Sequence, residues 1–201
     1  MKLGGWEVKV AVGAMPQKVA TAFSEYFGTL VGAEYTPIAY LGSQVVNGIN
    51  HAILAEQVLT TGRDEKNVVL IVMNERGEDF TVVRIENLVA QGAPLGGIKI
   101  DVETKIPEEA QKAWNTAFEG FVGSTVEPFA YLGSQVTNGT DYIFAATTKM
   151  IVRPMNNGVG MKFGADNVVI VVVHTGTNHA DFINVLEHTE GEKNLGYAFT
   201  W

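Results

Sequence analysis

One phrase occurs twice in this chain. Residues 40–50 read YLGSQVVNGIN and residues 131–141 read YLGSQVTNGTD, 91 positions apart. The similarity continues upstream, because LGGWEVKV at 3–10 has a counterpart in LGGIKIDV at 95–102. A repeat of this length predicts two copies of one supersecondary unit. We therefore expect two domains, residues 1–94 and residues 95–201, with the boundary near Gln91 to Pro94.

Each copy has the apolar spacing of an amphipathic helix. Hydrophobic residues recur every three or four positions from Val19 to Val31, and again from Ala110 to Val122. This spacing places them on one helix face that packs against another layer. Proline suits a first helical turn, and glycine suits the residue after the last turn. The residues that predict these ends are Pro16, Pro107, Gly32 and Gly123.

Strand-like segments follow each helix. In the first copy they are joined in pairs by Asn47-Gly48, a strong signal for a two-residue type I′ hairpin, and by the charged segment 75–79. The second copy repeats this pattern around Asn138-Gly139 but carries nine additional residues near 153–164. The predicted fold class is α+β. Each domain would be one long helix packed on an antiparallel sheet of about four to five strands, able to fold by itself.

Composition restricts the partners. The formal net charge is −8, so the surface repels phosphate backbones, and we expect no nucleic-acid partner. No apolar run approaches the roughly 20 residues that span a membrane, and the first ten residues lack the apolar core of a signal peptide. We expect no membrane partner; the location is cytoplasmic by default, or secreted if a leader has been removed. The chain has no cysteine, which excludes disulfides and a cysteine nucleophile.

The segment Gln44-Val45-Val46-Asn47-Gly48 resembles the Gln-x-Val-x-Gly hairpin of the cystatin superfamily, whose members inhibit papain-like cysteine proteases. Asn50 follows the glycine by two positions, as is usual in that family, and Leu3-Gly4-Gly5 resembles the cystatin N-terminal trunk. The order of glycine pair, helix and hairpin also agrees. The extended phrase is similar to bacterial cystatin-like proteins. The resemblance implies a tandem of two cystatin-like domains.

In that family the trunk and two hairpin tips form a hydrophobic wedge that fills the protease cleft. The second copy departs from the motif at Thr137, and neither copy has the Pro-Trp dipeptide of the family's second hairpin. The expected function is protein binding, with a papain-like cysteine protease as partner. The alternative is a non-inhibitory interaction module with another partner. The implied contact residues are Gly4, Gly5, Gln44, Val45, Val46, Asn47 and Gly48, with Gln135, Val136, Thr137, Asn138 and Gly139 in the second copy.

The sequence contains few groups of residues that are typical of a catalytic or metal site. No nucleophile elbow, phosphate loop or paired-carboxylate motif occurs, so we expect no enzyme. His174, His179, His188 and Asp181 form the densest group of potential metal ligands, and histidines with a carboxylate can hold zinc. Their spacing is not that of a recognised site, and surface turns often carry histidines. We therefore expect neither a metal ion nor a cofactor.

Overall fold

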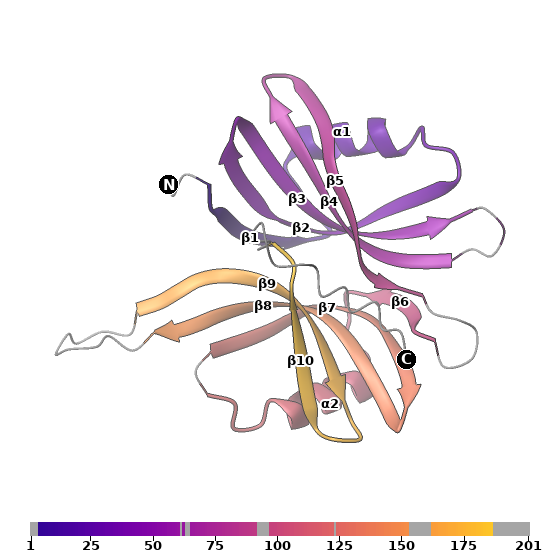
Figure 1. Ribbon diagram of the computed structural model, residues 1–201, viewed down its shortest axis with the longest axis vertical. Helices are drawn as coiled ribbons and strands as arrows, with labels where there is room; N and C mark the ends of the chain where they lie inside the picture. Colours follow the sequence, from indigo (N-terminus) through magenta and orange to yellow (C-terminus); the bar gives the residue numbers. More distant parts are fainter. Residues whose placement is uncertain are drawn as a thin grey trace.

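The computed structural model describes residues 4–60, 62, 65–91, 97–122, 124–152 and 162–186, without the side chains of 150–152 and 162–165. These residues form two five-stranded antiparallel sheets, each accompanied by one helix (Figure 1). The first sheet has the order β1-β2-β3-β4-β5 and the second has the order β10-β9-β8-β7-β6. Each half therefore runs strand, helix and four further strands.

The first half contains β1 (Trp6–Val12), α1 (Gln17–Phe27), β2 (Ala33–Val46), β3 (Gly48–Leu59), β4 (Glu65–Arg76) and β5 (Asp79–Ala90). The second half contains β6 (Lys99–Glu103), α2 (Glu108–Ala117), β7 (Ser124–Thr137), β8 (Gly139–Val152), β9 (Lys162–His174) and β10 (His179–Asn184). None of the helices described here is long and apolar enough to cross a membrane.

The predicted fold class, α+β with one long helix in each cystatin-like domain, is wrong. Strands dominate the described residues, and the helices are short, with 11 residues in α1 and 10 in α2. The apolar spacing continues to Val31, but α1 stops at Phe27, before Gly28, because glycine is a poor helix former. Gly32, the predicted stop, has φ of +94° but lies beyond that end. In the second half Gly123 lies outside the described residues.

The central strands of each sheet are buried on both faces. Phe23 and Phe27 of α1 pack on one face of the first sheet, and Trp114 of α2 packs on one face of the second. The opposite faces of the two sheets share a single buried cluster, in which Leu54 lies with Leu132. Figure 1 shows the same layering, with the helices outside two facing sheets. The helices therefore cover only half of the sheet surface, and each sheet covers the other.

Continuous apolar runs explain this arrangement. Residues 68–73 of β4 and residues 168–173 of β9 are all buried. A strand with one face in water would alternate apolar and polar residues, whereas a strand covered on both faces reads as a continuous apolar run. The expectation that residues 1–94 and 95–201 fold independently stays a prediction. The shared cluster adds a condition, because an isolated half would expose its inner face.

Candidate functional site

Three chain segments meet at one end of the first sheet. They are the trunk Gly4–Gly5, the β2–β3 turn at residues 45–48 and the β4–β5 turn at residues 75–79. Strand pairing aligns them, because Trp6 is opposite Gln44, Gln44 is opposite Asn50 and Asn50 is opposite Asn74. We call these three segments the hairpin edge. It unites the predicted trunk and first-hairpin residues with a turn from later in the chain.

A chain of side-chain hydrogen bonds crosses the hairpin edge. Gln44 Nε2 donates to the carbonyl oxygen of Gly4 at 2.9 Å, and Asn50 Nδ2 donates to Gln44 Oε1 at 3.0 Å. Asn74 Nδ2 donates to Asn50 Oδ1 at 2.8 Å, and Arg76 Nε donates to Asn74 Oδ1 at 3.0 Å. Each amide therefore both donates and accepts, and the chain fixes the trunk to both turns.

The first hairpin lies where Asn47-Gly48 predicted it, but the turn differs. Val46 pairs with Gly48, so only Asn47 separates the paired residues. A type I′ turn needs positive φ at both central positions. Gly48 has φ of +102°, whereas Asn178 is the sole non-glycine residue with positive φ in the described part of the chain. The type I′ prediction is therefore wrong. Arg76 Nε also donates to the Asn47 carbonyl oxygen at 3.1 Å, which ties this turn to the next.

The tip presents an apolar side chain to solvent. Val46 is 42% exposed, and Val45 is half-buried. The adjoining β4–β5 turn is charged, with the Glu78 side chain 91% exposed. The hairpin edge is thus an apolar tip beside a polar, mainly acidic turn. Such a surface can enter a cleft at the valines while the charged turn stays at its rim.

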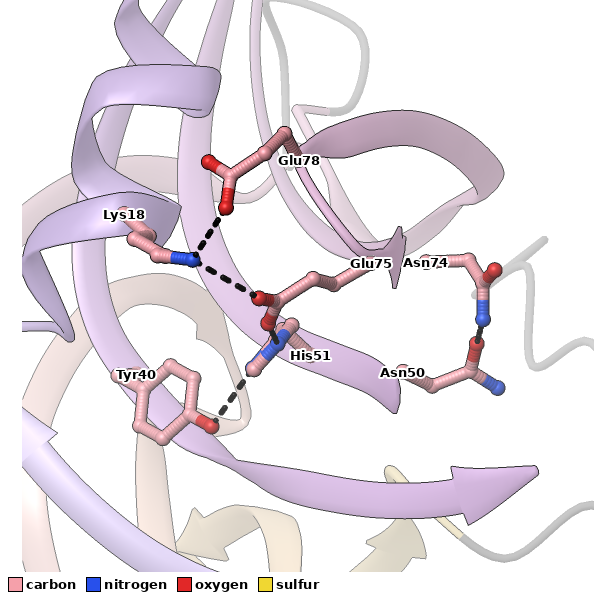
Figure 2. Close-up of polar contacts among 7 residues, drawn as sticks. All are labelled: Lys18, Tyr40, Asn50, His51, Asn74, Glu75 and Glu78. Carbon is pink, nitrogen blue, oxygen red and sulfur yellow. Dashed lines mark hydrogen bonds and ion pairs between the residues drawn. The ribbon is translucent and has the colours of Figure 1, made fainter. Parts of the chain in front are cut away.

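A buried polar network supports the β4–β5 turn from behind (Figure 2). His51, 6% exposed, lies with Nδ1 3.0 Å from the Tyr40 hydroxyl and Nε2 2.9 Å from Glu75 Oε2. Burial raises the pKa of Tyr40, and a hydrogen bond with Ser43 partly opposes that shift. The hydroxyl therefore keeps its proton and can donate a hydrogen bond to His51 Nδ1. Each polar atom of the histidine ring then has a partner.

The same network reaches the helix. Lys18 of α1 points at the turn, with Nζ 3.2 Å from Glu78 Oε1 and 3.9 Å from Glu75 Oε1 (Figure 2). The Lys18 side chain is 59% exposed, so these ion pairs add little to stability. They do restrict where the turn can lie relative to α1. Sequence reasoning missed this group, because its members are far apart in the chain and become neighbours through strand pairing.

The second copy builds a different edge. Val136 is 76% exposed at its hairpin, Thr137 pairs with Gly139, and Asn138 lies between them. Gln135 is buried and lies opposite Asp141, the counterpart of Asn50. Asp141 in turn is opposite His174, where the first copy has Asn74. Two of the three amides of the chain, those of Asn50 and Asn74, are therefore replaced by ionisable groups. The second glycine trunk and the predicted insert near 153–164 fall largely outside the described residues.

The predicted histidine group is partly assembled. His174, His179 and Asp181 lie together at the β9–β10 hairpin, whereas His188 lies outside the described residues. The sequence predicts that the helix faces from Val19 to Val31 and from Ala110 to Val122 pack against another layer, and among their aromatic residues Phe23, Phe27 and Trp114 are buried. Tyr26 and Phe121 are 45% and 46% exposed, so the apolar spacing overestimated the buried stripe toward the helix ends.

Comparison with known proteins adds no relative: no family model, no curated protein and no solved structure matches this chain.

Proposed function

We propose that this protein binds another protein through the hairpin edge, and that the partner is a papain-like cysteine protease whose cleft receives the Val45–Gly48 turn. The observation that carries the proposal is the alignment of trunk and two turns in one row, joined by side-chain hydrogen bonds. A row of preformed turns loses little conformational entropy on docking.

The exposed tip supports the same function. Val46 is 42% exposed and lies outside the buried hydrophobic clusters of the first sheet. A largely apolar cleft binds an apolar tip of this kind. The tight pairing of Val46 with Gly48 keeps this backbone folded back on itself. A protease needs an extended segment to cleave, so a turn held in this way would occupy the cleft without becoming a substrate.

One observation favours the alternative, a non-inhibitory interaction module. The β4–β5 turn carries Glu75, Arg76, Glu78 and Asp79, where a protease-filling wedge would be apolar. Charged side chains lose hydration on entering a cleft, and without partners there they oppose binding. In this alternative the same hairpin edge binds a surface with basic groups facing that turn.

The test is a titration of papain with the full chain, using hydrolysis of a small fluorogenic peptide as readout. Inhibition that is competitive with the peptide supports the protease proposal. Size-exclusion chromatography of the same mixture detects a complex that forms without inhibition, which would contradict insertion of the turn into the cleft. If papain stays fully active and no complex forms at micromolar concentrations of both proteins, the protease proposal is wrong.

A further inference from the structure

We propose that a groove between α1 and the first residues of β2 binds an extended peptide of another protein, which adds to the first sheet as a strand. The groove lies at the opposite end of β2 from the hairpin tip. Its volume is about 520 Å³, within the usual range of binding pockets. The lining is mainly apolar and includes Met15, Phe23, Phe27, Leu30, Tyr35 and Pro37.

One side of the groove is a strand edge that has no partner among the described residues. β1 pairs with β2 only from Ala39 to Gln44. Beyond that ladder, the Gly13 N–H donates to the Ile38 carbonyl oxygen at 3.1 Å, and the chain then leaves the sheet to enter α1. Residues 33–37 of β2 therefore pair with β3 on one side and are open on the other.

The alternation of hydrogen bonds along β2 determines which backbone groups face the open side. The Thr60 N–H donates to the Gly32 carbonyl oxygen at 3.0 Å, so these two residues form a hydrogen-bonded pair. Such pairs alternate along an antiparallel ladder, and the residues between them direct their N–H and C=O away from the partner strand. Ala33 and Tyr35 therefore offer a donor and an acceptor to the groove. Pro37 offers only an acceptor, and proline is found at such free edges.

An extended peptide matches both the strand edge and the groove. Its backbone would exchange hydrogen bonds with Ala33 and Tyr35, as when a strand adds to an exposed sheet edge. Peptide residues opposite Ala33, Tyr35 and Pro37 would lie on the same face as the Tyr35 ring, which is 4.6 Å from the Phe27 ring of α1. Every second side chain of the peptide would therefore enter the apolar groove.

Charge selects the residue between two of these positions. Glu34 is exposed, and among the described residues that line the groove it alone is charged. None of the ion pairs among the described residues involves it. A basic residue directly opposite would stabilise the strand pairing, and an acidic one would oppose it. The occupant is thus a segment such as Val-Thr-Val-Lys-Val, which in antiparallel orientation places its lysine opposite Glu34.

Small side chains give the groove its room. Its helical wall contains Ala20, Ser24 and Gly28, which share one helix face because they are four residues apart. Their counterparts in the second half are larger and polar, and they line a separate hollow beside α2: Gln111, Asn115 and Glu119. Thr125 stands there in place of Glu34. The proposed site is therefore specific to the first half.

NMR titration of the isotope-labelled full chain with acetyl-Val-Thr-Val-Lys-Val-amide tests the groove. We expect saturable binding that slows amide hydrogen exchange at Ala33 and Tyr35. Exchange at Glu34 should not change, because by the same alternation its N–H already bonds to β3. Glutamate in place of the peptide lysine should weaken binding about 3- to 10-fold, and Glu34→Lys should reverse this preference. Glu109→Lys, an exposed position on α2, is the control that should leave it unchanged.

Filling the groove gives a second readout. Ala20→Gln combined with Ser24→Asn introduces the residues of the second half and should weaken binding at least about tenfold. Neither side chain is buried in the core cluster under α1, and circular dichroism checks that the variant is folded.

Three results would overturn the proposal. The first is no binding of the peptide at millimolar concentration. The second is binding that leaves exchange at Ala33 and Tyr35 unchanged, or a lysine preference that Glu34→Lys and Glu109→Lys alter equally. The third is slow exchange at Ala33 and Tyr35 without peptide, because the edge would then already be occupied, by a second copy if analytical ultracentrifugation shows a dimer and by another segment of the chain if it shows a monomer.

Discussion

Gly48 has both a conformational and a spatial reason to be glycine. Its φ is +102°, and a Cβ there would lie 2.4 Å from the Glu75 carbonyl oxygen. Gly77 in the next turn has φ of +67°, but nothing lies within 4 Å of an added Cβ. Gly48→Ala should therefore lower the free energy of unfolding by about 3 kcal/mol, and Gly77→Ala by about 1 kcal/mol. Urea unfolding measures both, and equal losses would contradict the close approach.

Two buried tyrosines should make stability depend on alkaline pH. Burial raises the pKa of Tyr40 and of Tyr131 above 10.0. The folded protein thus holds these protons more tightly than the unfolded chain, so stability is complete below about pH 10 and falls as pH rises further. Urea unfolding at a series of pH values should show a shallower fall for Tyr40→Phe and for Tyr131→Phe. Unchanged slopes in both variants would contradict the role of burial.

The sequence predicted the place of the first hairpin but not its geometry. Asn47-Gly48 breaks two strand-like runs, which is a local signal and was sufficient. The turn type depends on Glu75 and Arg76, which approach from a strand more than 25 residues later in the chain. The amide chain depends on the same pairing. Asn50 could be noticed because it follows the motif, whereas Asn74 has no local pattern that marks it.

At the scale of elements, β4 is the clearest sign that both sheet faces are covered. Leu70 lies on the face shared with the second sheet, and Ile71 lies on the face toward α1; both are fully buried. Leu70→Ala and Ile71→Ala should each lower the free energy of unfolding by about 2–5 kcal/mol. Ile85, the strand partner of Ile71 on β5, is 42% exposed, and Ile85→Ala should cost under about 1 kcal/mol.

Chemical denaturation of these three variants distinguishes two arrangements. A sheet covered only by its helix would leave Leu70 in water, and Leu70→Ala would then cost no more than Ile85→Ala.

The predicted helices are too long because apolar spacing indicates which residues face the sheet, not where the backbone leaves the helix. Gly28 and Gly120 lie closer to the observed helix ends than Gly32 and Gly123, the predicted stops.

At the scale of the molecule, the two halves meet through similar apolar faces. Ile38 and Leu54 of the first sheet lie in one cluster with Leu132 and Ile170 of the second. Residues 1–94 expressed alone would expose this face, and the cover most readily available is the same face of a second copy. We expect an isolated half to fold as a dimer, as measured by analytical ultracentrifugation with circular dichroism. A stable folded monomer would show that the shared cluster is not needed.

The duplicated phrase predicted two similar units, but nothing in it indicated that they would pack on each other. That information lay in the apolar runs of β4 and β9, where alternation is missing. A fold with one helix on one sheet face leaves half of those side chains unexplained. The hairpin edge is compatible with this packing, because its tip extends beyond the buried part of the sheet, where Val46 remains exposed.

The most direct test of the proposed function is the inhibition constant of the full chain for papain, compared with that of Val46→Asp. At an exposed tip the aspartate costs little stability. In a closed cleft its carboxylate would be desolvated without a partner, costing several kcal/mol, on the order of a thousandfold in affinity. Thr137→Asp, at the same place in the second hairpin, should change the constant far less. We predict strong inhibition that Val46→Asp abolishes; equal inhibition by both proteins, or none by either, would contradict binding through the hairpin edge.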